Sequence, residues 1–337
     1  MRLDSSTATA PALAGVLHWA LRLGALLPRL LTGLIALMLG GCATPQLAQL
    51  VQFWPTDLPA RAELKQVPFY AQEDYECGPA ALAMAATAAG LTLRPEQLVD
   101  QVYLPGRQGS LQLEMLAAGR RQGLLAYPLA PRLENVLREV AAGHPVIVFQ
   151  NLSLPIYPVW HYAVVIGFER ERQALLLHSG RTEFLEMSLA TFERTWARGQ
   201  HWSMVLLPPA TLPVTAQPDA HATAAAALER VQPQAALVAY NRALQTWPTQ
   251  RAALLGRGNA AYALGEKEQA AQAYRQATAV QPDFADAWNN LAQVLLEQGQ
   301  FGPARQAIEQ AVALGGPRRV AYQDLQQKIE EKSASRH

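Results

Sequence analysis

A 34-residue period in the C-terminal third of the chain most constrains what this sequence can fold into. Small and large residues recur at the same phase over three successive periods, and a proline or glycine closes each of them. Small residues let two antiparallel helices approach closely, and such helix pairs stack into a solenoid. The superposed positions are Ala236, Ala270 and Ala304; Tyr240, Tyr274 and Ile308; Ala243, Ala277 and Ala311; Pro248, Pro282 and Gly316; Leu254 and Trp288; and Gly265 and Gly299.

This spacing resembles the tetratricopeptide repeat. Two units are clear, at residues 251–284 and 285–318, and a unit with a degenerate, alanine-rich first helix precedes them at residues 217–250. A polar helix over residues 320–332 would cap the stack. The resemblance implies an all-α repeat domain over residues 220–332 that binds a protein partner.

Two asparagines are candidate peptide-binding residues in this domain. Asn259 and Asn290 occupy positions where peptide-clamping repeats often have asparagines that bond a ligand backbone. The alternative is that both only solvate the groove. Leu255 and Val320 stand where the lysines of a carboxylate clamp are expected, so recognition of a C-terminal carboxylate is not predicted.

The second constraining feature is Cys77, which is followed by Gly78 and Pro79 and then by an alanine- and leucine-rich run. Proline is tolerated in the first turn of a helix, so Cys77 is placed at a helix N-terminus. The unpaired amides there favour a thiolate over a thiol, which makes Cys77 a candidate nucleophile. A buried structural cysteine is the alternative interpretation.

The box formed by Gln72, Cys77, Gly78, Pro79, Ala80, Leu82 and Met84 resembles the catalytic box of papain-fold peptidases that cut bacteriocin leaders after a double glycine. The resemblance implies that Cys77 attacks the carbonyl and that Gln72, after a strand expected at residues 67–70, donates to the oxyanion. Double-glycine specificity does not follow, because those peptidases usually sit on a transporter and this chain contains no transport domain.

The order of predicted elements agrees with a papain-like fold. Helices are predicted near residues 77–89, 95–103, 111–122 and 133–142, and strands at residues 145–149, 161–168, 174–178 and 202–207. We therefore predict an α+β cysteine peptidase domain with an antiparallel sheet over residues 61–207. A proline-rich linker is expected at residues 208–219.

His161 is the candidate general base, because it opens a β-branched strand that reads His-Tyr-Ala-Val-Val. The leader peptidases have a histidine at the start of such a strand and usually an aspartate on the next one, where this chain has His178 and no carboxylate. His178 is the expected orienting residue for His161. His144, His201 and Asn151 are alternatives. Residues 157–160, just before His161, either flank the cleft or only pack at the strand entrance.

The N-terminal residues resemble a lipoprotein signal peptide. A 12-residue apolar segment, Leu30 to Gly41, is too short to span a bilayer and suits a signal-peptide core. Residues 39–42 resemble a bacterial lipobox, which implies cleavage after a signal peptide of residues 1–41 and lipidation of Cys42. Residues 42–60 are expected to form a tether. Ala43 and Thr44 are not acidic, which by analogy favours the periplasmic face of the outer membrane; an uncleaved anchor is the alternative.

Composition narrows the functional classes. The 337-residue chain carries a net charge of +1, which argues against a nucleic-acid binder. Neither a metal-type Cys/His cluster nor a nucleotide-binding loop is present, so no cofactor is expected. Of the two cysteines, Cys42 ends the signal-like segment and is the expected lipidation site, which leaves no pair for a disulfide in the mature protein.

Three functions fit these observations. The first is a lipid-anchored cell-envelope cysteine peptidase that hydrolyses a peptide or protein, with repeats that recruit substrate or partner. The second is a non-enzymatic adaptor whose peptidase-like domain grips a peptide. The third is a hydrolase of cell-wall stem peptides, which the Cys-Gly-Pro-Ala box disfavours because such enzymes typically follow the cysteine with serine and glycine.

Overall fold

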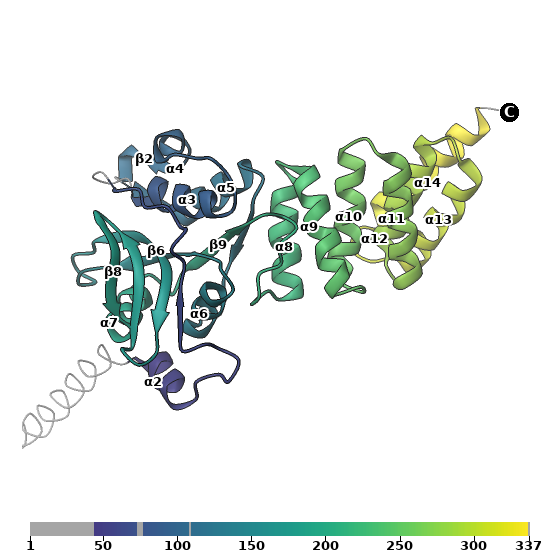
Figure 1. Cartoon of the computed structure of the whole chain (residues 1–337). Helices are drawn as coiled ribbons and strands as arrows, with labels where there is room; N and C mark the ends of the chain where they lie inside the picture. Colours follow the sequence, from purple (N-terminus) through teal and green to yellow (C-terminus); the bar gives the residue numbers. More distant parts are fainter. Residues whose placement is uncertain (1–43, 73–76, 108, 336–337) are drawn as a thin grey trace, which may run out of the picture.

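The computed structural model describes residues 44–72, 77–107 and 109–335, and it contains an α+β domain followed by a row of helices (Figure 1). The predicted signal peptide and Cys42 lie outside the described residues, as do residues 73–76. No helix in the described part of the chain has the length and hydropathy to cross a bilayer.

An antiparallel sheet forms the centre of the first domain. Its strands are ordered β4-β9-β5-β6-β7-β8, and β1 pairs with the far end of β6. The four strands predicted from sequence are confirmed as β5, β6, β7 and β9. The strands are β1 (Arg61–Glu63), β4 (Leu125–Pro128), β5 (Val146–Asn151), β6 (Trp160–Glu169), β7 (Ala174–Ser179), β8 (Thr182–Ser188) and β9 (Ser203–Leu207), with a separate hairpin of β2 (Tyr103–Leu104) and β3 (Gly109–Ser110).

Helices cover both faces of the sheet, with α3, α4 and α5 on one face and α2, α6 and α7 on the other (Figure 1). The alanines of α3 allow this helix to lie close to β6, and residues 78–86 are all buried. The helices are α2 (Pro45–Gln52), α3 (Cys77–Ala88), α4 (Val99–Val102), α5 (Gln112–Arg121), α6 (Leu133–Ala141) and α7 (Leu189–Arg198).

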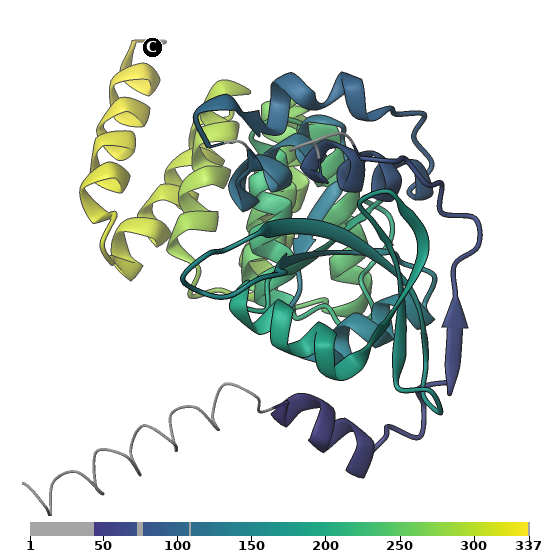
Figure 2. The same ribbon diagram turned by 90° about the vertical axis from the view of Figure 1, so that its left-hand side faces the viewer.

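Two expectations about the N-terminal part of the domain are wrong. From Pro45 onward the expected tether is instead helix α2, which buries Leu47 and Leu50 and lies beneath α7 (Figure 2). Its first N–H groups donate to the buried carboxylate of Glu193 on α7. Residues 67–70, expected as a strand, have no strand pairing, and β1 provides the strand at residues 61–63.

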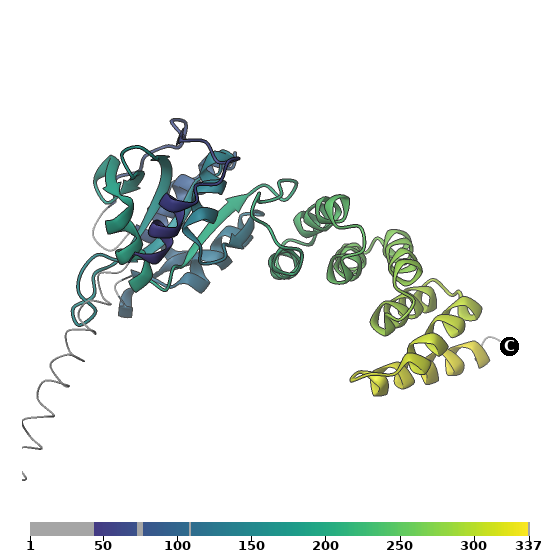
Figure 3. The ribbon, with the colours of Figure 1, turned by 90° about the horizontal axis from the view of Figure 1, so that it is seen from below.

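The C-terminal region consists of antiparallel helix pairs that form a row leading away from the first domain (Figure 3). The alanines of the 34-residue period are buried, as the pattern predicts. Gly256 and Gly258 lie against the rings of Tyr240 and Tyr274, where a side chain would collide. The helices are α8 (Pro218–Glu229), α9 (Pro233–Thr246), α10 (Arg251–Ala263), α11 (Lys267–Val280), α12 (Ala285–Glu297), α13 (Phe301–Leu314) and α14 (Arg319–Ala334).

The segment between the domains packs on the first domain. Thr215 donates from its backbone N–H and its hydroxyl to the buried carboxylate of Glu139, at 2.8 and 2.6 Å. The hydroxyl of Tyr127 on β4 accepts a bond from the backbone of Gln217 at 3.1 Å. Helix α8 contacts β4, so the repeats are fixed to that edge of the sheet.

Candidate active site

Cys77 is the first residue of α3, and its half-buried sulfur lies against the start of β6. The backbone amides of Tyr162, Gly78 and Cys77 itself act on the thiol in the direction that lowers its pKa. Burial nevertheless outweighs these amides and raises the pKa of the Cys77 thiol. Gly78 is required in the box because a side chain there would collide with Ser110.

His161 lies immediately before Tyr162, so the fold brings it next to the residue that contacts the Cys77 sulfur. The ring Nε2 of His161 is 2.9 Å from the hydroxyl oxygen of Ser179 at the end of β7. That bond leaves Nδ1 as the ring nitrogen available to take a proton. Burial lowers the pKa of His161 to about 4, which favours the neutral imidazole.

These two pKa shifts argue against the thiolate that the helix N-terminus predicts for Cys77. A raised thiol pKa and a lowered imidazole pKa both favour the uncharged forms near neutral pH. No direct hydrogen bond joins the Cys77 sulfur to the His161 ring in this state. Such bonds often tighten only when substrate is bound.

Gln72 lies beside the same pair of strands. Its backbone N–H donates to the carbonyl of Gly180 at 3.1 Å, one residue after the partner of His161. Its side chain is buried, and its amide nitrogen has no hydrogen-bond partner among the described residues. A buried donor without a partner is costly in a folded protein, so this group is suited to a ligand oxygen.

His178 does not contact His161, which corrects its expected role as the orienting residue. Its register partner is Val164, and its Nε2 lies 3.2 Å from the carbonyl of Val67. The ring packs between Phe69 and Phe184, with centroids 5.2 Å away in both cases. His178 therefore holds the segment that leads to Gln72 against β7 and β8.

The other candidates for the orienting role also have different partners. His144 bonds Glu139 at 2.7 Å, and His201 packs edge-on against Trp196. Asn151 accepts bonds from the backbone of the loop that follows β5. The sequence analysis missed Ser179. The register between β6 and β7 decides which side chains of β7 face His161, and the sequence does not show that register.

A cleft of about 270 Å³ adjoins Gln72 and the first turns of α3. It provides space for substrate side chains next to the candidate oxyanion donor. No group of three or more His, Cys, Asp or Glu side chains in the described ranges is arranged to hold a metal ion. The cleft is lined by Phe69, Tyr70, Ala71, Gln72, Ala80, Pro95 and Glu96.

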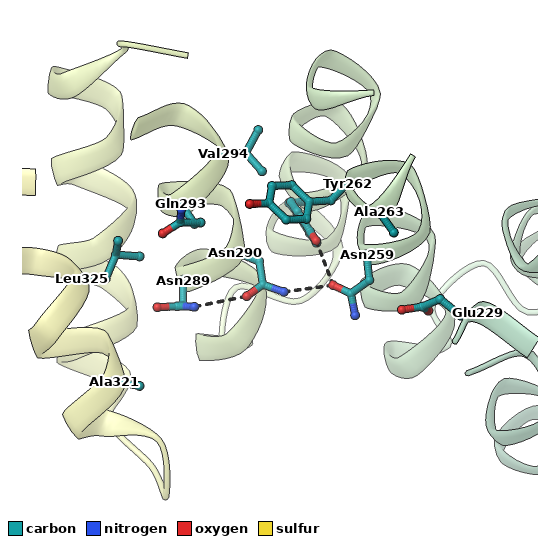
Figure 4. A pocket seen from close by; sticks show the side chains of 11 residues that line it. Glu229, Asn259, Tyr262, Ala263, Asn289, Asn290, Gln293, Val294, Ala321 and Leu325 are labelled. Carbon is teal, nitrogen blue, oxygen red and sulfur yellow. Dashed lines mark hydrogen bonds between the residues drawn. The ribbon is translucent and has the colours of Figure 1, made fainter. Parts of the chain in front are cut away.

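A second cavity, of about 450 Å³, lies in the groove of the repeats and includes both predicted asparagines. Figure 4 shows a directed chain of amides: Asn289 donates to Asn290 at 3.1 Å, and Asn290 donates to Asn259 at 3.0 Å. The hydroxyl of Tyr274 also donates to the Asn259 oxygen, at 2.8 Å. The Asn259 oxygen is thereby occupied, and its amide nitrogen is left for a ligand.

Comparisons with known proteins agree with this division of the chain. Residues 64–202 match the model of the Peptidase_C39 like family, and residues 220–279 and 255–318 match that of the tetratricopeptide repeat. The protein thus combines a C39-like peptidase domain, α+β with an antiparallel sheet, with a helical tetratricopeptide-repeat region. No curated protein matches the chain.

Three solved structures resemble one domain each. The Sgt2 TPR domain from Aspergillus fumigatus is 25% identical, covers 36% of this chain and 82% of its own, and gives a TM-score of 0.33. A structure described as a C39-like peptidase from Bacillus anthracis is 16% identical, with coverages of 44% and 98% and a TM-score of 0.38. The first TPR of Spaghetti (RPAP3), bound to the HSP90 peptide SRMEEVD, is 16% identical, with coverages of 32% and 83% and a TM-score of 0.30.

Proposed function

We propose that this protein is a cysteine peptidase in which Cys77 is the nucleophile, His161 the general base and acid, and Gln72 the oxyanion donor. The observation that carries the proposal is the placement of the Cys77 sulfur at the backbone amide of Tyr162, next to His161. The unpartnered side-chain nitrogen of Gln72 adds a donor at the same strand ends.

The uncharged resting forms imply a concerted first step. His161 takes the thiol proton as the sulfur–carbon bond forms, and the negative charge moves to the carbonyl oxygen. The side chain of Gln72 and the backbone N–H of Cys77 stabilise that oxygen. The protonated His161 then donates to the leaving amine, and a water molecule, deprotonated by His161, hydrolyses the thioester.

Alkylation and peptide cleavage test this proposal together. Iodoacetamide should label Cys77, and a peptide library should be cut by the wild-type chain but not by Cys77→Ala. His161→Ala should slow both reactions at least tenfold, whereas His144→Ala, which changes a histidine outside the site, should not. Cleavage that survives Cys77→Ala would contradict the proposal.

The adaptor remains the second candidate, because the raised thiol pKa and the neutral partner of His161 both disfavour a strong nucleophile. An adaptor would bind library peptides without cutting them, and Cys77 would alkylate at the same slow rate with or without His161. A stem-peptide hydrolase would instead cut muropeptides and leave the peptide library intact.

We infer that the groove of the repeats binds an extended segment of a substrate or partner. The lining contains one carboxylate, Glu229, and no Lys, Arg or His among the described residues. This charge disfavours a C-terminal carboxylate and favours a neutral or basic segment. Asn259→Ala should weaken binding to a peptide array, whereas Asn241→Ala, outside this groove, should not; equal losses would exclude the groove.

We further propose that Cys42 is lipidated and that the protein is attached to the cell envelope, at the periplasmic face of the outer membrane. Helix α2 packs on the domain from Pro45 onward, so an anchor three residues earlier would hold the domain within about 10 Å of the membrane surface. Mass spectrometry and membrane fractionation of wild-type and Cys42→Ser protein test this. An unmodified Cys42 in the mature protein would contradict it.

A further inference from the structure

The loop between β5 and β6, together with the first residue of β6, exposes six apolar side chains within nine residues. Residues 152–160 contain no charged side chain, and they are followed directly by His161. Exposed apolar clusters of this kind usually mark interaction sites in soluble domains. The exposed fractions are 42% for Leu152, 58% for Leu154, 75% for Ile156, 75% for Tyr157, 54% for Val159 and 50% for Trp160.

Hydrogen bonds hold this loop in one conformation. The side-chain oxygen of Asn151 accepts from the backbone N–H groups of Ser153 and Val159, at 3.0 and 2.9 Å. Leu152 donates to the carbonyl of Val159 at 2.9 Å, and Arg198 on α7 donates to the carbonyl of Ser153 at 3.0 Å. The apolar side chains are therefore presented by a fixed backbone, which lowers the entropy cost of binding.

The loop leads directly into the candidate active site. Trp160 stacks on Phe149 with ring centroids 5.1 Å apart, which fixes the end of the loop on the sheet. The next residue is His161, and the backbone amide of the one after it, Tyr162, acts on the Cys77 thiol. A peptide positioned for attack by Cys77 would thus lie within reach of the loop.

We propose that the loop of residues 152–160 binds an apolar stretch of the substrate on one side of the scissile bond. The inference rests on the proposed peptidase function and adds a substrate class to it. Continuity with the site favours a substrate over a membrane surface. The loop also lacks the Lys and Arg residues that attract anionic lipids.

Cleavage-site profiling tests the inference. The double variant Ile156→Ser/Tyr157→Ser changes two side chains that are each 75% exposed, so the fold should not be affected. For peptides with Leu, Ile, Val or Phe near the cut, we expect kcat/KM to fall about tenfold through KM. Serine-rich peptides and alkylation of Cys77 by iodoacetamide should stay within twofold of wild type. Leu314→Ser, which changes an exposed apolar residue at the end of α13, is the matched control.

The outcomes separate this inference from the peptidase proposal. Unchanged selection of apolar peptides in the double variant would overturn the inference and leave the peptidase intact. If the wild type cuts nothing, the peptidase proposal fails, and binding of the same library to Cys77→Ala, with and without the loop changes, still decides the role of the loop. Loop-dependent sedimentation of Cys42→Ser protein with phosphatidylethanolamine–phosphatidylglycerol vesicles, without any effect on peptides, would assign the loop to a membrane.

Discussion

At the scale of single residues, the neutral partner of His161 distinguishes this site. A carboxylate beside an imidazole stabilises the imidazolium, whereas a serine hydroxyl only fixes the orientation of the ring. Ser179 lies 2.9 Å from Nε2 of His161, and burial lowers the pKa of that ring. The site therefore retains positioning but lacks the charge that would favour an ion pair with Cys77.

We predict that Ser179→Asp raises the pKa of His161, because a carboxylate within bonding distance typically shifts a neighbouring group by about one to three units. Alkylation of Cys77 at pH 7 should then accelerate about tenfold, as more of the thiol is ionised. The measurement is the alkylation rate between pH 4 and 9. Ser179→Thr should retain the wild-type pH profile. A wild-type pH profile in Ser179→Asp would show that Ser179 does not act on the ring.

His178 should behave differently, because its bonds lead to the backbone of Val67 and its ring packs against Phe69 and Phe184. His178→Ala should reduce the free energy of unfolding by about 2 kcal/mol through the cavity it leaves. The pH profile of alkylation should keep its wild-type midpoint. Urea denaturation and the alkylation profile measure the two effects, and a shifted midpoint would restore His178 to the catalytic arrangement.

At the scale of elements, the sequence predicts the helices and strands whose buried surface is visible as a pattern of neighbouring residues. Apolar runs predict four strands, β5, β6, β7 and β9. The proline and alanines of α3 predict that helix. Helix α7 was missed because Glu193 and Thr195 interrupt its buried face. Their partners, the start of α2 and Gln150 on β5, are distant in sequence. Strand β8 is a mostly exposed edge strand, and only Leu185 and Met187 alternate with exposed residues, which is too short a pattern to predict a strand.

The same distinction applies to the site. Three site residues belong to short sequence motifs, so a sequence resemblance is enough to predict them: Gln72, Cys77 and His161. The pairing of β6 with β7 places Ser179 beside His161. That pairing shifts register between Val165 and Gly167. A shift of one residue exchanges the two faces of a strand. No local pattern reveals such a shift, which is why His178 was selected in place of its neighbour.

Helix α2 depends on one carboxylate. Glu193 is 2% exposed and accepts bonds from the N–H groups of Gln46 and Leu47 at 2.9 and 2.8 Å. Glu193→Ala leaves these donors without a partner at the positive end of the helix, and it should lower stability by about 2 kcal/mol. Limited proteolysis should then cut near residues 53–60.

Two variants calibrate that result. Glu193→Gln keeps one acceptor oxygen and should lie between wild type and alanine, whereas Glu171→Ala, in an exposed turn, should match wild type. Protection of residues 53–60 that is unchanged in Glu193→Ala would mean that the apolar contacts of Leu47 and Leu50 alone hold α2 in place.

At the scale of the whole molecule, the repeats and the candidate site are on different parts of the sheet. Helix α8 contacts the β4 edge, while His161 is on β6, three strands further along the order β4-β9-β5-β6. At about 4.8 Å per strand, this separation is roughly 14 Å within the sheet alone. A partner held in the repeat groove must therefore reach the cleft through an extended segment. The hydrogen bonds between Glu139 and Thr215 fix the junction of the two domains, so the distance that this segment must span is constant.

Acid should destabilise both domains, because each contains a buried histidine with a lowered pKa. Burial lowers the pKa of His161 and of His221 to about 4. In the unfolded chain a histidine titrates near 6.5, so between about pH 6.5 and 4 the unfolded state binds more protons than the native state. Stability therefore falls as the pH is lowered through this window, by up to about 3 kcal/mol for each histidine, and the loss stops below about pH 4.

His221 allows this dependence to be separated by domain. It is fully buried on α8, neither ring nitrogen has a hydrogen-bond partner in the described part of the chain, and Arg242 adds a repulsive charge. His221→Leu removes the titrating group and two unpaired polar atoms, so the variant should be at least as stable as wild type at pH 7. Between pH 7 and 4.5 the urea midpoint of the repeat transition should fall in wild type and change much less in the variant. Equal declines in both proteins would mean that His221 is not the group that makes the repeats acid-sensitive.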